Sequence, residues 1–170
     1  MSAVARPLRV GRWVGAPLAV ALLASLLLAA PIRLAGLPLP EPVTLMVPAF
    51  AWALIRPALS PAAALLVGGL ALEVLWGAPT GLWSLSLLAA YLPVLAFRNV
   101  LAGQSQVVLW VWFGLACLLA QATGWLATLW LSGAAPSLAA SGLQWLATVV
   151  LFPLASFLVE HFRDADVRFR

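Results

Sequence analysis

The sequence has few charged residues and no lysine. Only 8% of its 170 residues are charged, whereas 65% are hydrophobic. A soluble domain carries about 25% charged residues, because its core must be covered by a polar surface. With a mean hydropathy of +1.09, this chain cannot build such a surface. We therefore expect most of it to be surrounded by lipid.

Cysteine and histidine are almost absent. Cys117 and His161 are the only residues of their kinds, and they lie far apart in the sequence. Zinc sites, haem ligation and disulfide frameworks need more such residues than this. No paired nucleophile and base and no phosphate-binding glycine-rich loop is visible either. We therefore expect no metal, no cofactor and no enzymatic activity.

The basic residues are all arginines, and they are dispersed. There are nine of them, separated by long apolar runs. A nucleic-acid-binding protein gathers such charges into a patch or groove. This dispersal excludes nucleic acid as a partner and favours reading the arginines as membrane-topology signals.

Six apolar runs approach the roughly 20 residues that a helix needs to cross the hydrocarbon core. They predict an all-α integral membrane protein with a single domain, 1–170, folded as a six-transmembrane-helix bundle. The expected spans are about 13–31, 42–56, 60–77, 79–97, 106–131 and 138–159. The first run imitates a secretory signal peptide, but Pro31 directly follows the plausible cleavage point, so we expect a retained helix.

The arginines predict the orientation of these spans. If the N-terminus is cytoplasmic, eight arginines fall in cytoplasmic segments and only Arg33 falls outside, as the positive-inside rule requires. If the short second span were re-entrant, Arg56 and Arg98 would be exported and this bias would be lost. We therefore expect six crossings, with both termini in the cytoplasm.

Small residues recur at every fourth position of the fifth span. Residues four apart share a helix face, so they form a groove that another helix backbone can approach closely. Two interpretations remain open. The groove packs the bundle against itself, or it receives a helix from a partner or from a second copy of the chain. The residues are Ala116, Ala120, Gly124, Thr128 and Ser132.

Glu73 is the only acidic residue inside a predicted span, about one turn from its outer end. A carboxylate at the centre of a membrane helix costs about 2.5 to 3.5 kcal/mol on insertion scales, and it is a functional hypothesis by default. Gly69 and Gly77 lie four residues before and after it, on the same helix face. Such a carboxylate can approach the N-terminus of a neighbouring helix.

The turn after Glu73 offers that helix start. Pro79 suits the first turn of the fourth helix, and Gly77 and Gly81 permit a tight reversal. In one interpretation Glu73 and this turn stabilise a hairpin of the third and fourth helices. In the other, Glu73 binds a substrate, a cation or a partner, and only Gln121 offers a comparably deep polar side chain.

The stretch 69–85, GLALEVLWGAPTGLWSL, resembles the signature of the rod shape-determining protein MreD family. The matching positions are Gly69-Leu70, Glu73, Gly77, Pro79 and Gly81. The length, the number of spans and Arg56-Pro57 after the second span also agree. The chain departs from the family pattern by having Glu73 where Asp is usual and Thr80 where Leu is common.

The resemblance implies a non-enzymatic scaffold in the bacterial inner membrane. Its implied partners are MreC, which has a single membrane helix, and the MreB, RodA and transpeptidase components of the peptidoglycan-synthesising elongation complex. It also implies a fold similar to the substrate-binding S component of energy-coupling-factor transporters. The alternative function is therefore a small-molecule-binding S component, in which Glu73 and Gln121 would line a pocket.

Overall fold

The computed structural model describes residues 11–28, 33–34, 37–38, 41–56 and 58–167, and almost all of these are helical. A short π-helix, η1, precedes the first α-helix, and two two-residue strands pair in an antiparallel hairpin. In chain order the elements are η1 (Gly11–Gly15), α1 (Ala16–Leu28), β1 (Arg33–Leu34), β2 (Leu37–Pro38), α2 (Met46–Ile55), α3 (Leu59–Trp76), α4 (Leu82–Leu101), α5 (Gln106–Ser132), α6 (Leu138–Val149) and α7 (Phe152–Val167).

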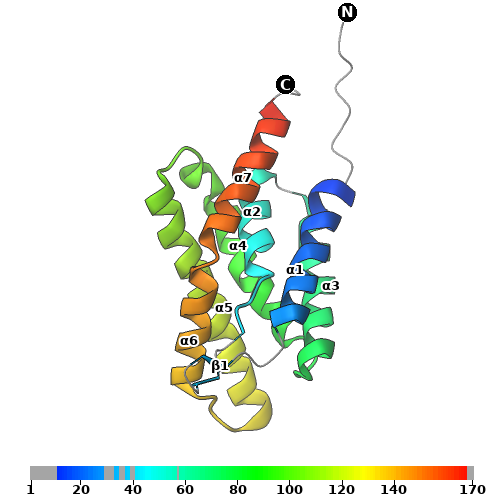
Figure 1. The fold of residues 1–170 in the computed structure, drawn as a ribbon, viewed down its shortest axis with the longest axis vertical. Coiled ribbons are helices and arrows are strands. Elements are labelled where there is room, and N and C mark those ends of the chain that lie inside the picture. The colour runs from blue at the N-terminus through cyan, green and yellow to red at the C-terminus, as the bar shows by residue number, and fades with distance from the viewer. Residues whose placement is uncertain (1–10, 29–32, 35–36, 39–40, 57, 168–170) are drawn as a thin grey trace, which may run out of the picture.

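Helices α1 to α6 run alternately up and down the long axis of the bundle, and α7 continues in the direction of α6 (Figure 1). The start of η1, the end of α7 and the α2–α3 and α4–α5 connections lie at one end, which we call the arginine end because it holds Arg56 and Arg98. The β1–β2 hairpin, the α3–α4 turn and the α5–α6 loop lie at the opposite end, the hairpin end.

Within the described residues, four segments are long and apolar enough to cross a membrane, and two shorter apolar helices accompany them. The expectation of an all-α membrane bundle is thereby confirmed. The four are Leu59–Trp76, Leu82–Leu101, Gln106–Ser132 and Leu138–His161, and the shorter two are Trp13–Leu28 and Met46–Ile55.

Helix α2 lies at the centre of the bundle. Every residue from Met46 to Ala53 is buried, and it packs against α4 and α7. Trp52 is 1% exposed and donates its indole N–H to the Trp13 carbonyl at 2.9 Å. Phe50 meets Phe113 of α5 edge to face, with ring centroids 5.3 Å apart. In contrast, Val74 and Trp130 are more than four-fifths exposed, as expected of lipid-facing side chains.

The predicted span 42–56 differs from α2, because its first residues are not helical. The Val43 N–H donates to Thr148 Oγ1 at 3.0 Å, and the Thr44 hydroxyl donates to the Ala21 carbonyl at 2.6 Å. Backbone outside helices is tolerated at membrane depth only where it is buried and satisfied by protein. These bonds to α6 and α1 meet that requirement.

The predicted span 138–159 is interrupted, since α6 ends at Val149 and α7 begins at Phe152. Pro153 has no N–H, and a proline ring clashes with the carbonyl four residues earlier in a continuous helix. That carbonyl belongs to Val149, and it accepts the Trp110 indole N–H at 3.3 Å. The proline therefore divides the last crossing into two helices.

Candidate functional site

Glu73 lies in the last turn of α3, and its side chain is 3% exposed. Its Oε2 accepts a hydrogen bond from the Gly81 N–H at 2.8 Å. Its Oε1 accepts two more, from the Ser84 N–H at 3.0 Å and from the Ser84 hydroxyl at 3.2 Å. Both carboxylate oxygens are therefore engaged within the chain.

The groups that bind Glu73 belong to the start of α4. Gly81 is the residue that caps this helix, and Ser84 is its third residue. The first N–H groups of a helix have no partner inside the helix, and the positive end of the helix dipole favours an anionic group there. Glu73 thus caps α4 from the preceding helix, as the structural interpretation of the hairpin expects.

The turn between α3 and α4 depends on two glycines in the left-handed region. Gly77 has φ of 62° and ends α3 with its N–H bonded to the Glu73 carbonyl, and Gly81 has φ of 90°. Glycine adopts such angles without steric cost. Because Gly81 cannot be helical at this angle, α4 begins at Leu82, and Pro79 lies before the helix and not in its first turn as the sequence predicts. The Pro79 carbonyl instead accepts the Leu82 N–H at 3.3 Å.

Gly69 brings the backbones of α3 and α4 together on the face that carries Glu73. A Cβ at this position would lie 2.5 Å from both the Cα and the N of Ser84. The Ser84 hydroxyl also reaches the Leu66 carbonyl of α3, at 3.2 Å. The five residues of the motif therefore all stabilise the α3–α4 hairpin. Gly69 lets the two helices approach closely, and Glu73 caps α4. Gly77, Pro79 and Gly81 form the turn that reverses the chain.

The small residues of the fifth span lie partly inside the bundle. Ala116 and Ala120 are buried, and a Cβ at Gly124 would lie 3.1 Å from Ser86 Oγ of α4. Thr128 and Ser132 bond the carbonyls four residues before them, at 2.8 and 2.7 Å, and Ser132 is exposed. The first part of this face therefore lies inside the bundle, and Gly124 packs against α4.

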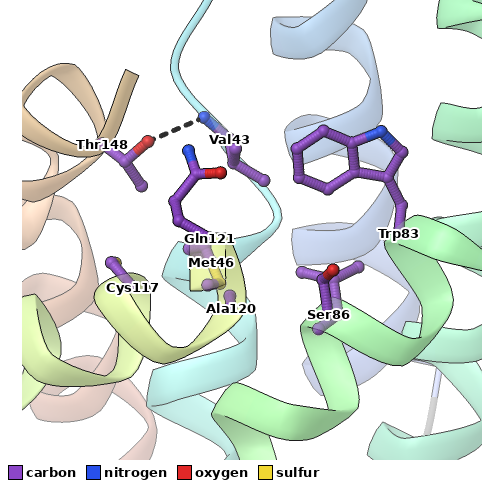
Figure 2. A pocket seen from close by; sticks show the side chains of 9 residues that line it. Val43, Met46, Trp83, Ser86, Cys117, Ala120, Gln121 and Thr148 are labelled. Atoms are coloured by element: carbon purple, nitrogen blue, oxygen red, sulfur yellow. Dashed lines mark hydrogen bonds between the residues drawn. The ribbon is translucent and has the colours of Figure 1, made fainter. Parts of the chain in front are cut away.

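Gln121 lines an enclosed cavity between α4, α5, α6 and the start of α2 (Figure 2). The cavity volume is about 10 Å³, near the minimum for one water molecule. A pocket for a vitamin-sized ligand measures about 300 to 1,000 Å³. Glu73 is not among the residues that line it, so the structure does not bring Glu73 and Gln121 together in one pocket.

A set of polar contacts that connects α5, α6 and the segment before α2 is not predicted from the sequence. Gln121 Nε2 donates to Gln144 Oε1 at 2.9 Å, and Gln144 Nε2 donates to the Glu41 carbonyl at 3.1 Å. One turn further, the Thr148 hydroxyl donates to the Gln144 carbonyl at 2.7 Å. The signal that could have revealed them is a pair of polar residues four apart in an apolar run, on one helix face.

The described residues contain no cluster of three or more His, Cys, Asp or Glu side chains that could hold a metal ion. The carboxylate of Glu73 accepts from the Gly81 N–H and from the N–H and hydroxyl of Ser84, all at the start of α4. The arrangement can hold two helices in register and shield a carboxylate from lipid. Comparisons with protein-family models, curated proteins and solved structures find nothing that matches the chain.

Proposed function

We propose that the chain is a scaffold of the MreD type in the bacterial inner membrane. It binds MreC, and through the elongation complex it helps to control cell shape and peptidoglycan synthesis alongside MreB, RodA and a transpeptidase. The observation that supports this proposal is the set of hydrogen bonds that the motif's carboxylate, Glu73, makes within the hairpin. Both oxygens of Glu73 accept hydrogen bonds from the start of α4, a structural role that suits a scaffold.

The orientation belongs to the same proposal. Arg56 is exposed at the arginine end, and Arg98 lies in the last turn of α4 at that end. Cytoplasmic loops of membrane proteins are enriched in such residues. We therefore assign the arginine end to the cytoplasm and the hairpin end to the periplasm, so that both termini are cytoplasmic.

The transport alternative has less support. This alternative expects Glu73 and Gln121 to line one pocket, but the cavity at Gln121 has the volume of about one water molecule and Glu73 does not line it. A scaffold needs a surface for a partner's helix instead. Because Ala116 and Ala120 are buried and Gly124 lies against α4, we assign MreC to another surface of the bundle.

The groove between α1 and α7, with α2 at its base, suits a single transmembrane helix. Its volume is about 450 Å³, and it is lined almost entirely by apolar side chains. Alanines of α1 form one wall, which permits the close helix approach that drives association in lipid. The lining includes Ala16, Val20, Ala24, Pro48, Leu154 and Phe157.

A pull-down of the tagged chain from detergent-solubilised membranes, read by mass spectrometry, tests the function. The expected result is co-purification of MreC. An energising ATPase and a coupling membrane subunit in place of MreC would favour the transport alternative and overturn the scaffold. A second, differently tagged copy in the same cells reports whether the chain also binds itself.

A matched pair of substitutions tests the groove. Val20→Trp places a large ring in the groove, whereas Val67→Trp makes the same change on the outer face of α3; the two valines are 66% and 61% exposed. We expect Val20→Trp to reduce MreC recovery at least about tenfold, a loss of about 1.4 kcal/mol of binding free energy, with Val67→Trp near wild type. Equal recovery with both variants would move the MreC site away from this groove while leaving the scaffold proposal intact.

A further inference from the structure

Helix α6 is weakly packed for a helix inside a bundle. Among its residues only Thr148, the second-last residue of the helix, is buried. Leu138, Leu143 and Leu146 are each more than half exposed. Two open grooves flank its contact with α5, with volumes of about 410 and 300 Å³.

Polar contacts attach α6 in place of tight apolar packing. Trp145 donates its indole N–H to the Gly114 carbonyl of α5 at 2.9 Å. Trp125 of α5 donates to the Pro136 carbonyl, just before α6, at 3.0 Å. Gln144 joins Gln121 and the Glu41 carbonyl, as described above. Each such bond between membrane helices contributes only about 0.6 kcal/mol on average.

Both ends of α6 are breaks in regular structure. Before the start of α6, helix α5 ends at Ser132 and is capped by Gly133, which has φ of 66°, and a short loop follows. At its end, Val150 and Leu151 separate it from α7. Breaks of this kind, where a few residues absorb a change in backbone angles, are the places about which rigid helices move.

Gln121 lies between two spaces. It lines the open groove of about 410 Å³ between α5 and α6, and it also lines the enclosed cavity in the core. In Figure 2 its side chain extends from α5 toward Thr148 of α6, across the cavity from Trp83. The Gln121–Gln144 bond therefore lies at the boundary between the core cavity and the outside of the bundle.

We propose that α6 is a strap, latched by Gln144, that lifts from α5 and opens the core cavity to the lipid-facing groove. The joints at Gly133 and at Val150–Leu151 allow the movement, and Thr148 keeps the C-terminal end of the strap attached to the Val43 backbone. The strap is independent of the scaffold function, because its evidence is the attachment of α6 to α5 and to residues 41–43, and it does not use the α3–α4 hairpin.

The only cysteine of the chain reports this opening directly. Cys117 is 1% exposed and lines the enclosed cavity. A thiol probe such as N-ethylmaleimide can react with it only after the cavity opens. In detergent, Gln144→Leu removes both side-chain bonds of the latch and should raise the labelling rate of Cys117 about tenfold, equivalent to about 1.4 kcal/mol.

Two controls separate strap opening from general loosening. Gln104→Leu makes the same chemical change at a glutamine that bonds the Val100 carbonyl at the arginine end, and its labelling rate should equal that of wild type. Gly69→Ala loosens the α3–α4 contact far from α6 in the chain. If Gly69→Ala speeds labelling as much as Gln144→Leu at equal loss of thermal stability, opening is global and the strap is overturned.

Hydrogen exchange of the unmodified protein provides an independent measurement. Amides of 138–147 should exchange at least about tenfold faster than those of 113–120 in α5, because a 12-residue helix detached from α5 opens its own hydrogen bonds readily. Equal exchange rates in the two segments would contradict the strap even if Gln144→Leu failed to fold.

Discussion

At the scale of single residues, Glu73 shows how a carboxylate becomes stable near lipid. Its oxygens receive three hydrogen bonds from the first turn of α4, so burial does not leave the group unsatisfied. The sequence already places a carboxylate between glycines beside a helix start, and this much of the site is predictable. That Gly81 and Ser84 bind the carboxylate cannot be predicted, because it depends on the angle between α3 and α4 after the turn.

Replacing Glu73 by glutamine tests the cap. The glutamine amide group donates, so one oxygen that accepts from Gly81 or Ser84 becomes a donor facing a donor. We expect a loss of about 1 to 3 kcal/mol in the free energy of unfolding. Thermal unfolding in detergent should show this as a fall of about 2 to 10 °C in Tm. An unchanged Tm, with loss of MreC binding, would instead favour a direct partner contact.

Tyr91 is the opposite case, a buried polar group without a bond. Its side chain is 1% exposed, and its hydroxyl has no hydrogen-bond partner among the described residues. Removing the hydroxyl removes an uncompensated desolvation penalty. Tyr91→Phe should therefore keep or raise the Tm, by up to a few degrees for about 1 kcal/mol. A clear fall in Tm would mean that the hydroxyl is bonded in solution.

At the scale of helices, the sequence predicts the long apolar elements well and the breaks poorly. Helices α3, α4 and α5 come from long runs in which charged residues are rare, which is the strongest sequence signal for a membrane helix. The division between α6 and α7 arises at Pro153, inside a run that is equally apolar on both sides. Only the structure shows that the Val149 carbonyl accepts a hydrogen bond from the Trp110 indole N–H, in place of a backbone N–H of the next helical turn.

The groove of the fifth span shows a second limit of sequence reasoning. Spacing alone identifies Ala116, Ala120 and Gly124 as one face, but it cannot say which helix occupies that face. The structure places α4 against Gly124, at Ser86 and Leu82. Close helix contacts of this kind are formed between distant segments, so periodicity does not encode them.

Two glycines give a matched test of helix approach. A Cβ at Gly69 would lie 2.5 Å from backbone atoms of Ser84, whereas a Cβ at Gly114 meets only side-chain atoms of Trp145 and Val149, at 3.9 Å. Gly69→Ala should therefore separate α3 from α4 and lower stability by about 1 to 3 kcal/mol. Gly114→Ala should change Tm by about a degree or less, and similar effects from both would contradict the close contact.

At the scale of the whole molecule, the proposed orientation can be tested with single cysteines. Thr80 at the hairpin end and Gln104 at the arginine end are both exposed. In a Cys117→Ala background, a membrane-impermeant thiol reagent added to spheroplasts should label Thr80→Cys strongly. Gln104→Cys should react only after permeabilisation. The reverse pattern would place the arginine end outside and contradict the positive-inside assignment.

The central position of α2 has a consequence for how the protein is made. A ten-residue helix spans about 15 Å, half of the roughly 30 Å hydrocarbon core, so it is a poor independent substrate for membrane insertion. It is synthesised second, yet α4 and α7, against which it packs, emerge from the ribosome later. During synthesis α2 therefore stays without its packing partners until α4 and α7 have been made. We expect the native packing of the bundle to form only after α7 is complete.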